Sequence, residues 1–108
     1  MGLLTRATYA DLGTTEQAVY TAPVGKNAVL IGGNIANKLD TIIRVDIYLK
    51  VGSSKFTILR SVAIPANDAF SFSGSEQKIV LNPGDQIVLK SNSGASADII
   101  LSLSEMAV

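Results

Sequence analysis

The sequence predicts an all-β protein: one antiparallel β-sandwich, of the jelly-roll or Ig-like type, with about 7–8 strands and an extended N-terminal arm. Three observations predict it. Short segments alternate between apolar and polar residues, clusters of Pro, Gly, Asn and Asp separate them every ~8–12 residues, and helical periodicity is missing. A length of 108 residues fits one domain. We divide it into an arm, residues 1–15, and a sandwich, residues 16–108.

The predicted arm, "MGLLTRATYADLGTT", has neither clean periodicity nor strong turn signals. Its apolar residues Leu3, Leu4, Tyr9 and Leu12 suit a segment that packs on a neighbouring molecule. Residues 3–12 are also the one place where a helix is an alternative.

The first half of the sandwich begins with "EQAVYTA", and a Pro-Gly turn, "PVGKN", leads into "AVLIGGNIAN". In that strand we expect Val29, Ile31 and Ile35 on one face. Gly32 and Gly33 predict a β-bulge or a close approach of another backbone.

The clearest strand is "TIIRVDIYLKV". Its alternation places one set of residues inward (Ile43, Val45, Ile47, Leu49 and Val51) and another outward (Arg44, Asp46, Tyr48 and Lys50). "GSS" then predicts a hairpin loop into "KFTILRSVAI", whose inward set is Phe56, Ile58, Val62 and Ile64.

The second half continues with "AFSFS", "QKIVL" and "QIVLKS". Between the last two, "NPGD" predicts a type II turn, because Pro and Gly suit its two central positions. The final strand, "ADIILSLSE", places Ala97, Ile99, Leu101 and Leu103 inward, which leaves Ile100 facing out.

Charge is scarce and balanced. Nine Lys and Arg offset nine Asp and Glu, and charged residues make up 17% of the chain, against about 25% in an average domain. A weakly charged surface predicts extensive protein contacts, and a small monomer with a large core is the alternative. The basic residues are scattered singly, so we expect neither nucleic acid nor an anionic membrane as a partner. We find no apolar run of about 20 residues and no signal peptide.

Residues for catalysis are scarce. Histidine and cysteine are absent, which removes the commonest general base, thiol nucleophiles and the commonest metal ligands. The carboxylates Asp11, Asp40, Asp68, Asp85 and Asp98 stand where turns favour Asp. We therefore expect no enzyme, no cofactor and no metal site.

Sugar binding is a separate hypothesis, because sandwiches often bind sugars through exposed aromatic rings. The chain has no Trp, so Tyr48 and Tyr9 are the candidates. For Tyr48 a cross-strand partner on an outer face is the simpler interpretation. Phe56, Phe70 and Phe72 are expected in the core.

Two stretches carry a family resemblance. Residues 14–49 contain "YTAPVGK", an alternating run, an Asn-centred bend and a second long strand. Residues 62–105 contain "IPA", a short strand, "KIVLNPGDQI" and a closing strand. Together they resemble small all-β virion proteins of tailed bacteriophages, which attach to the capsid surface, the neck or the tail.

The resemblance implies a virion structural protein, most simply a capsid decoration (cement) protein on the outside of the head. Its partners would be the major capsid protein, neighbouring virion proteins or further copies of itself as a homo-oligomer. A neck, tail or fibre component and a carbohydrate- or receptor-binding module remain alternatives. As candidate interface residues we name Leu3, Leu4, Tyr9, Leu12, Tyr48 and Ile100.

Overall fold

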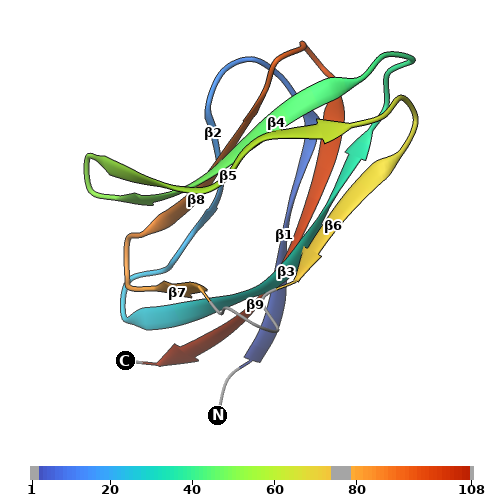
Figure 1. The fold of residues 1–108 in the computed structure, drawn as a ribbon. Coiled ribbons are helices and arrows are strands. Elements are labelled where there is room, and N and C mark those ends of the chain that lie inside the picture. Colours follow the sequence, from blue (N-terminus) through green and yellow to red (C-terminus); the bar gives the residue numbers. More distant parts are fainter. Residues whose placement is uncertain (1–2, 74–78, 108) are drawn as a thin grey trace.

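A computed structural model describes residues 3–73 and 79–107, and in these residues it contains strands and turns without a helix (Figure 1). The strands are β1 (Leu3–Leu12), β2 (Gln17–Thr21), β3 (Lys26–Asn37), β4 (Ile43–Val51), β5 (Ser54–Ile64), β6 (Ala69–Ser73), β7 (Ile79–Leu81), β8 (Gln86–Ser91) and β9 (Ala97–Ala107). No helix of the described part is therefore long and apolar enough to cross a membrane.

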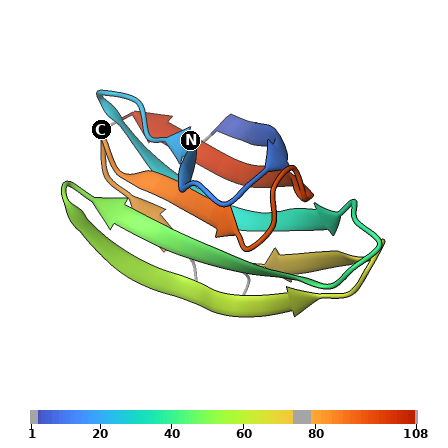
Figure 2. The same cartoon turned by 90° about the horizontal axis from the view of Figure 1, so that it is seen from above.

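The strands form two antiparallel sheets that face each other as layers (Figure 2). One has the order β1-β9-β3-β6, with β7 also paired to β3, and the other has the order β2-β8-β4-β5. Successive strands repeatedly cross from one sheet to the other, so that the first pairs with the last and the second with the last but one. This winding is a jelly roll, and it decides between the two predicted sandwich types.

The predicted arm is a strand of the sandwich. Residues Leu3–Leu12 form β1, which pairs with β9 from Leu3↔Glu105 to Leu12↔Ala97. Pairing satisfies the backbone hydrogen bonds that a free arm would leave to water. The boundary between residues 1–15 and 16–108 is thus not a division of the structure, and β1 is the strand by which the total exceeds the prediction.

The core lies between the two inner faces and follows most of the predicted alternation. On β9 the side chains of Ala97, Ile99, Leu101 and Leu103 are buried, whereas Ile100 faces out with 47% of its surface exposed. On β4 the residues Ile43, Val45 and Ile47 are buried. The prediction for β9 is confirmed. That for β4 is confirmed for its first three residues, whereas Leu49 is half-buried and Val51 is 41% exposed.

The prediction for β3 is partly wrong because a bulge changes its alternation. Ala28 and Leu30 are buried instead of Val29 and Ile31, and the register shifts between Leu30 and Gly32. After the shift Ile35 is buried, as expected. The predicted bulge is therefore present, and one extra residue reverses which side chains face the core.

The second glycine of β3 is closely approached by side chains, and not by another backbone as predicted. A methyl group at Gly33 would lie 2.6 Å from Cζ of Phe72 and 2.9 Å from Cδ2 of Leu101. Phe72 and Phe70 are half-buried against the core, and their ring centroids are 6.4 Å apart.

The prediction that Phe56 lies in the core is wrong. Phe56 is 56% exposed, and Val51 on the same side of the β4–β5 hairpin is 41% exposed. Two register shifts interrupt the pairing of β4 with β5. Because β5 is an edge strand, the hairpin end is not fully covered by the opposite sheet.

Two loops are held together at one end of the sandwich by a buried side chain. Asn37 Nδ2 donates to the carbonyl oxygens of Thr41, Ile64 and Pro65, and Asn37 Oδ1 accepts from the N–H of Leu39. These bonds join the β3–β4 and β5–β6 loops, which we call the loop tip (residues 38–42 and 65–68). Elsewhere, Gly84 has φ +91° and Asp85 N–H donates to Asn82 O at 3.0 Å, so the predicted type II turn is confirmed.

Candidate interaction surface

The outer side of the sheet β1-β9-β3 carries little charge. The odd-numbered residues of β9 from Ala97 to Leu103 are buried, so the even-numbered ones face outward, and directly paired residues share a side. We call this surface the neutral face; it consists of Leu4, Arg6, Thr8, Val29, Gly32, Asn34, Ser71, Val80, Ile100, Ser102, Ser104 and Met106.

Two rows of paired side chains cross the neutral face. One runs Leu4, Ser104, Val29 and Val80, and the other runs Thr8, Ile100, Asn34 and Ser71. Leu4 is 82% exposed and Val80 57%. Arg6 is the one charged residue in this set; Asp98, the even-numbered residue at the start of β9, lies at the end of the face and is paired with Lys38. The apolar and hydroxyl-bearing side chains of the neutral face can pack on another protein with little desolvation of charge.

A salt bridge marks one end of this sheet. Lys38 Nζ lies 3.0 Å from Asp98 Oδ1 and also bonds Asp11. The hydrogen bond from Lys38, followed by one from the backbone N–H of Asp11, lowers the pKa of Asp98. The hydrogen bonds that Lys38 donates to the carboxylates of Asp11 and Asp98 raise the pKa of Lys38. The charges at this end are thus paired with one another.

The structure brings together two of the six predicted interface residues. Leu4 and Ile100 both belong to the neutral face. Leu3, 69% exposed, pairs with Glu105 on the opposite side of the same strand pair. Tyr9 is half-buried against the core, and Leu12 is buried, so Leu12 is a core residue and its assignment to an interface is wrong.

Sequence reasoning missed Val29 and Val80, which add apolar area to the neutral face. The prediction grouped Val29 with Ile35 on one face, whereas the bulge between Leu30 and Gly32 puts these two residues on opposite faces. Val80 lies in a strand of three residues, Ile79–Leu81, whose central residue faces out. In both strands the alternation of the neighbouring residues in the sequence is the signal that bears on which side these two residues face.

The neutral face ends at an open strand edge. Within the described residues β1 pairs with β9 alone, so its other edge has no strand beside it. From Leu3 to Ala10 it carries one charge, Arg6, and no Pro. The register irregularity of β1 lies at its end, between Tyr9 and Leu12. The edge strand β5 has two register shifts within its length, together with Lys55 and Arg60. Natural proteins protect edges with such features, so β1 is the less protected edge.

The other sheet has a charged outer side. Its basic face consists of Arg44, Lys50, Lys55, Arg60 and Lys90, with Asp46 and Glu16 as the carboxylates among the described residues. Glu16 forms an ion pair with Lys55. The hydrogen bond from Lys55 is the main cause that lowers the pKa of Glu16, and Lys90 and Lys50 contribute through their charge.

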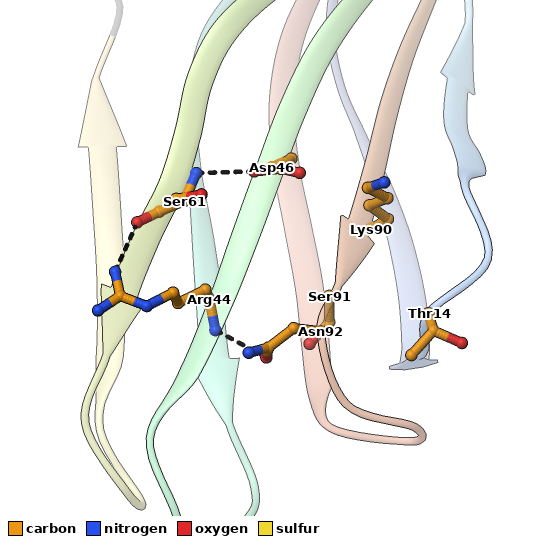
Figure 3. A pocket seen from close by; sticks show the side chains of 7 residues that line it. All are labelled: Thr14, Arg44, Asp46, Ser61, Lys90, Ser91 and Asn92. Carbon is orange, nitrogen blue, oxygen red and sulfur yellow. Dashed lines mark hydrogen bonds between the residues drawn. The ribbon is translucent and has the colours of Figure 1, made fainter.

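A cleft of about 300 Å³ opens on the basic face (Figure 3), lined by Thr14, Arg44, Asp46, Ser61, Lys90, Ser91 and Asn92. Asp46 Oδ1 accepts from the N–H of Ser61 at 2.7 Å, and Asp46 Oδ2 accepts from the hydroxyl of Tyr48 at 3.1 Å. Figure 3 shows the Arg44 side chain directed towards Ser61, whose carbonyl it bonds, and Lys90 on the other side of Asp46. The cations therefore do not converge on one point.

One face of the Tyr48 ring is covered by the ammonium group of Lys55. Lys55 Nζ lies 5.1 Å from the ring centroid, and the hydroxyl bonds Asp46. Burial, followed by the bond to Asp46, raises the pKa of Tyr48. A sugar would have to displace Lys55 in order to stack on that face of the ring. In the described residues no group of three or more acidic side chains is placed to hold a metal ion.

Comparisons with known proteins show the fold. No protein-family model and no curated protein matches the chain. A solved structure of Bacillus endospore appendages, which form a family of disulfide-linked pili, covers all of this chain and 91% of its own, with TM-score 0.57 and 8% identity. The match to the nucleoplasmin-like N-terminal domain of Drosophila FKBP39 covers 100% of this chain and 91% of that domain's chain, with TM-score 0.50 and 14% identity.

A pentameric capsid protein from metagenomic phage sequences is also similar. It covers 95% of this chain and 62% of its own length, with TM-score 0.45 and 12% identity. At these identities the likenesses concern the fold, and function has to be argued from the surfaces.

Proposed function

We propose that this chain is a structural protein of a tailed-phage virion, a decoration protein that binds the outside of the head shell through its neutral face. The neutral face is the observation that carries the proposal. It has the size and chemistry of a protein contact, and the sequence resemblance to small all-β virion proteins supplies the setting.

The dimensions of the face support this role. Strand β9 has 11 residues, which span about 37 Å at a rise of about 3.4 Å per residue. Four strands, β1, β9, β3 and β6, are about 19 Å wide at a spacing of about 4.8 Å. The resulting area of about 700 Å² is close to the ~800 Å² that each partner loses in a standard interface.

The fold supports a structural role in general terms. Jelly rolls recur in viral capsid proteins, and the pilus-forming appendages of Bacillus share the architecture. Because this chain has no Cys, its contacts would be non-covalent, unlike the disulfide links of those pili. A repeated shell also strengthens weak contacts through multivalency. We propose no catalytic activity for it.

The first test is the copy number on purified particles. A decoration protein is present in a large number fixed by the symmetry of the shell, whereas a neck, tail or fibre component is present in few copies. Quantitative mass spectrometry against the major capsid protein gives the ratio, and an image of the particle gives the position. Absence from particles would overturn the proposal, and a low ratio would replace it with the neck or tail alternative.

The second test concerns the neutral face. Leu4→Lys and Ile100→Lys place a charge on it, and occupancy on particles should fall by about tenfold or more. Val51→Lys is a matched control, because Val51 is similarly exposed (41%) but lies on the β4–β5 hairpin. Thermal unfolding shows whether each variant is folded. Wild-type occupancy with both variants would refute docking through the neutral face.

A further inference from the structure

The basic face has more positive charge than its own carboxylates neutralise. Five basic residues stand against Asp46 and Glu16, while the whole chain has zero net charge. Among the described residues Lys55 is the member with a carboxylate within 4.0 Å. Asp46 already accepts two hydrogen bonds. The positive charge of Arg44, Lys50, Arg60 and Lys90 is thus left for an external partner.

One strand pair on this face carries an unfavourable contact. Lys50 of β4 lies directly opposite Lys55 of β5, and like charges in that position destabilise a sheet. Glu16 relieves Lys55 but forms no ion pair with Lys50. A carboxylate arriving from outside would relieve this repulsion, so the sheet gains from being covered by an acidic surface.

The complementary charge lies on the same molecule at the loop tip. Asp40 and Asp68 are exposed there, and neither forms an ion pair with a described residue, whereas the basic residue of the tip, Lys38, is paired with Asp11 and Asp98 outside it. Asn67 Nδ2 donates to Asp40 Oδ1, and Asn67 N–H donates to Leu39 O. With the buried Asn37 beneath them, both loops are fixed before any contact forms, which lowers the entropy cost of binding. Ile42, 55% exposed, adds apolar area.

We propose that copies of this chain associate head to tail, with the acidic loop tip of one copy on the basic face of the next. In this arrangement a copy bound through its loop tip still has its basic face free for another copy, so the proposed contact is heterologous and repeats from copy to copy. A second copy is favoured over nucleic acid because Asp46 and Glu16 interrupt the positive charge, which suits a partner of mixed charge better than a uniform polyanion. The inference does not depend on the virion role.

Charge reversal tests the contact on the full chain. The face variant is Arg44→Glu with Lys50→Glu, and the tip variant is Asp40→Lys with Asp68→Lys. Sedimentation is measured up to millimolar protein, at about 10 mM salt, where the Debye length is about 30 Å, and at about 150 mM, where it is about 8 Å. The wild type should associate more strongly at low salt. Each variant alone should associate about tenfold less or weaker, because like charges then face each other.

Mixing the two variants is the decisive step. The acidic tip of the face variant then matches the basic face of the tip variant, and the reversed tip of the tip variant matches the reversed face of the face variant. Association should therefore return towards the wild-type level. Arg6→Glu is the control, since it makes the same kind of change on the neutral face and should leave association as in the wild type. Thermal unfolding confirms that every variant is folded.

The contradicting results are equally specific. A wild type that stays monomeric at low salt, reversed variants that associate like the wild type, or a mixture that does not recover would each overturn the proposal. Duplex DNA serves as a second probe of the basic face. Tight binding of DNA that is lost in the face variant, without self-association, would assign the face to nucleic acid instead.

Discussion

Replacing Gly33 by Ala should destabilise the protein by overpacking the core. The added methyl group would lie 2.6 and 2.8 Å from Cζ and Cε1 of Phe72 and 2.9 Å from Cδ2 of Leu101. Carbon atoms in favourable contact are about 3.5–4.0 Å apart. The Phe72 ring would therefore have to move by about 1 Å, in a core that is already packed densely.

The magnitude follows from that displacement. Overpacking by one methyl group costs about 1–3 kcal/mol. For a domain of this size each kcal/mol lowers Tm by about 4–8 °C, so we expect a decrease of about 5–20 °C. Urea unfolding followed by circular dichroism gives the free energy directly. The chain has no Trp, so the backbone signal is the appropriate probe.

A matched control and a double mutant isolate the cause. Gly94 has open space around its Cβ position, so Gly94→Ala should change the free energy of unfolding by less than about 0.5 kcal/mol. In a Phe72→Leu background, Gly33→Ala should cost less than in the wild type, because the ring that it strikes has gone. An equal cost in both backgrounds, or a neutral Gly33→Ala, would refute the reasoning.

Three further changes test the hydrogen bonds and charges. Asn37→Ala leaves three carbonyls without their donor and should cost about 2–4 kcal/mol in urea unfolding; wild-type stability would show that water replaces the side chain. Burial, and then the bond to Glu105, raises the pKa of Tyr20 above its ordinary 10.0. The contribution of Tyr20 to the free energy of unfolding is thus present below pH 10.0 and lost as pH rises above it. Tyr20→Phe should remove this loss of stability at alkaline pH, as measured by urea unfolding. The bond from Lys38 lowers the pKa of Asp98 below its ordinary 3.8, so its contribution is present above pH 3.8 and lost as pH falls. Asp98→Asn should make thermal stability less sensitive to acid, and unchanged pH profiles would contradict either assignment.

The sequence predicted the strands better than their faces. On β9 every second residue from Ala97 to Leu103 is apolar, and apart from Ile100 the residues between them are polar, so the inward set is correct. On β3 one bulge adds a residue and exchanges the two faces beyond it, whereas on β5 two register shifts each add a residue and exchange the faces only between them. The pair Gly32–Gly33 marks the first of these bulges, but the β5 bulges include Ser61, with φ 53°, at a position that no glycine marks.

Strand β1 could not be recognised by periodicity. Its inward residues Thr5 and Ala7 are no more apolar than its outward residue Leu4. With equal polarity on both sides, alternation carries no signal. Its strand character comes from its long pairing with β9, which is a contact between the two ends of the described chain.

The candidate surfaces are likewise assembled by the fold. Basic residues that are spread singly along the sequence, such as Arg44 and Lys90, come together because β4 and β8 are neighbours. The low content of charged residues predicts extensive protein contacts without saying where on the molecule they lie. The division into a neutral face and a basic face depends on which residues share a side of each sheet, and that required the register.

The central position of β9 bears on how the protein is made. This strand provides the pairing partner of both β1 and much of β3, yet a ribosome delivers it after every other strand. Until then β1 lacks its partner, and the inner faces of both sheets are incompletely covered. Until β9 has emerged, the nascent strands are thus exposed to misassociation or to chaperones, and the sandwich acquires its native layer in one concerted step once β9 arrives.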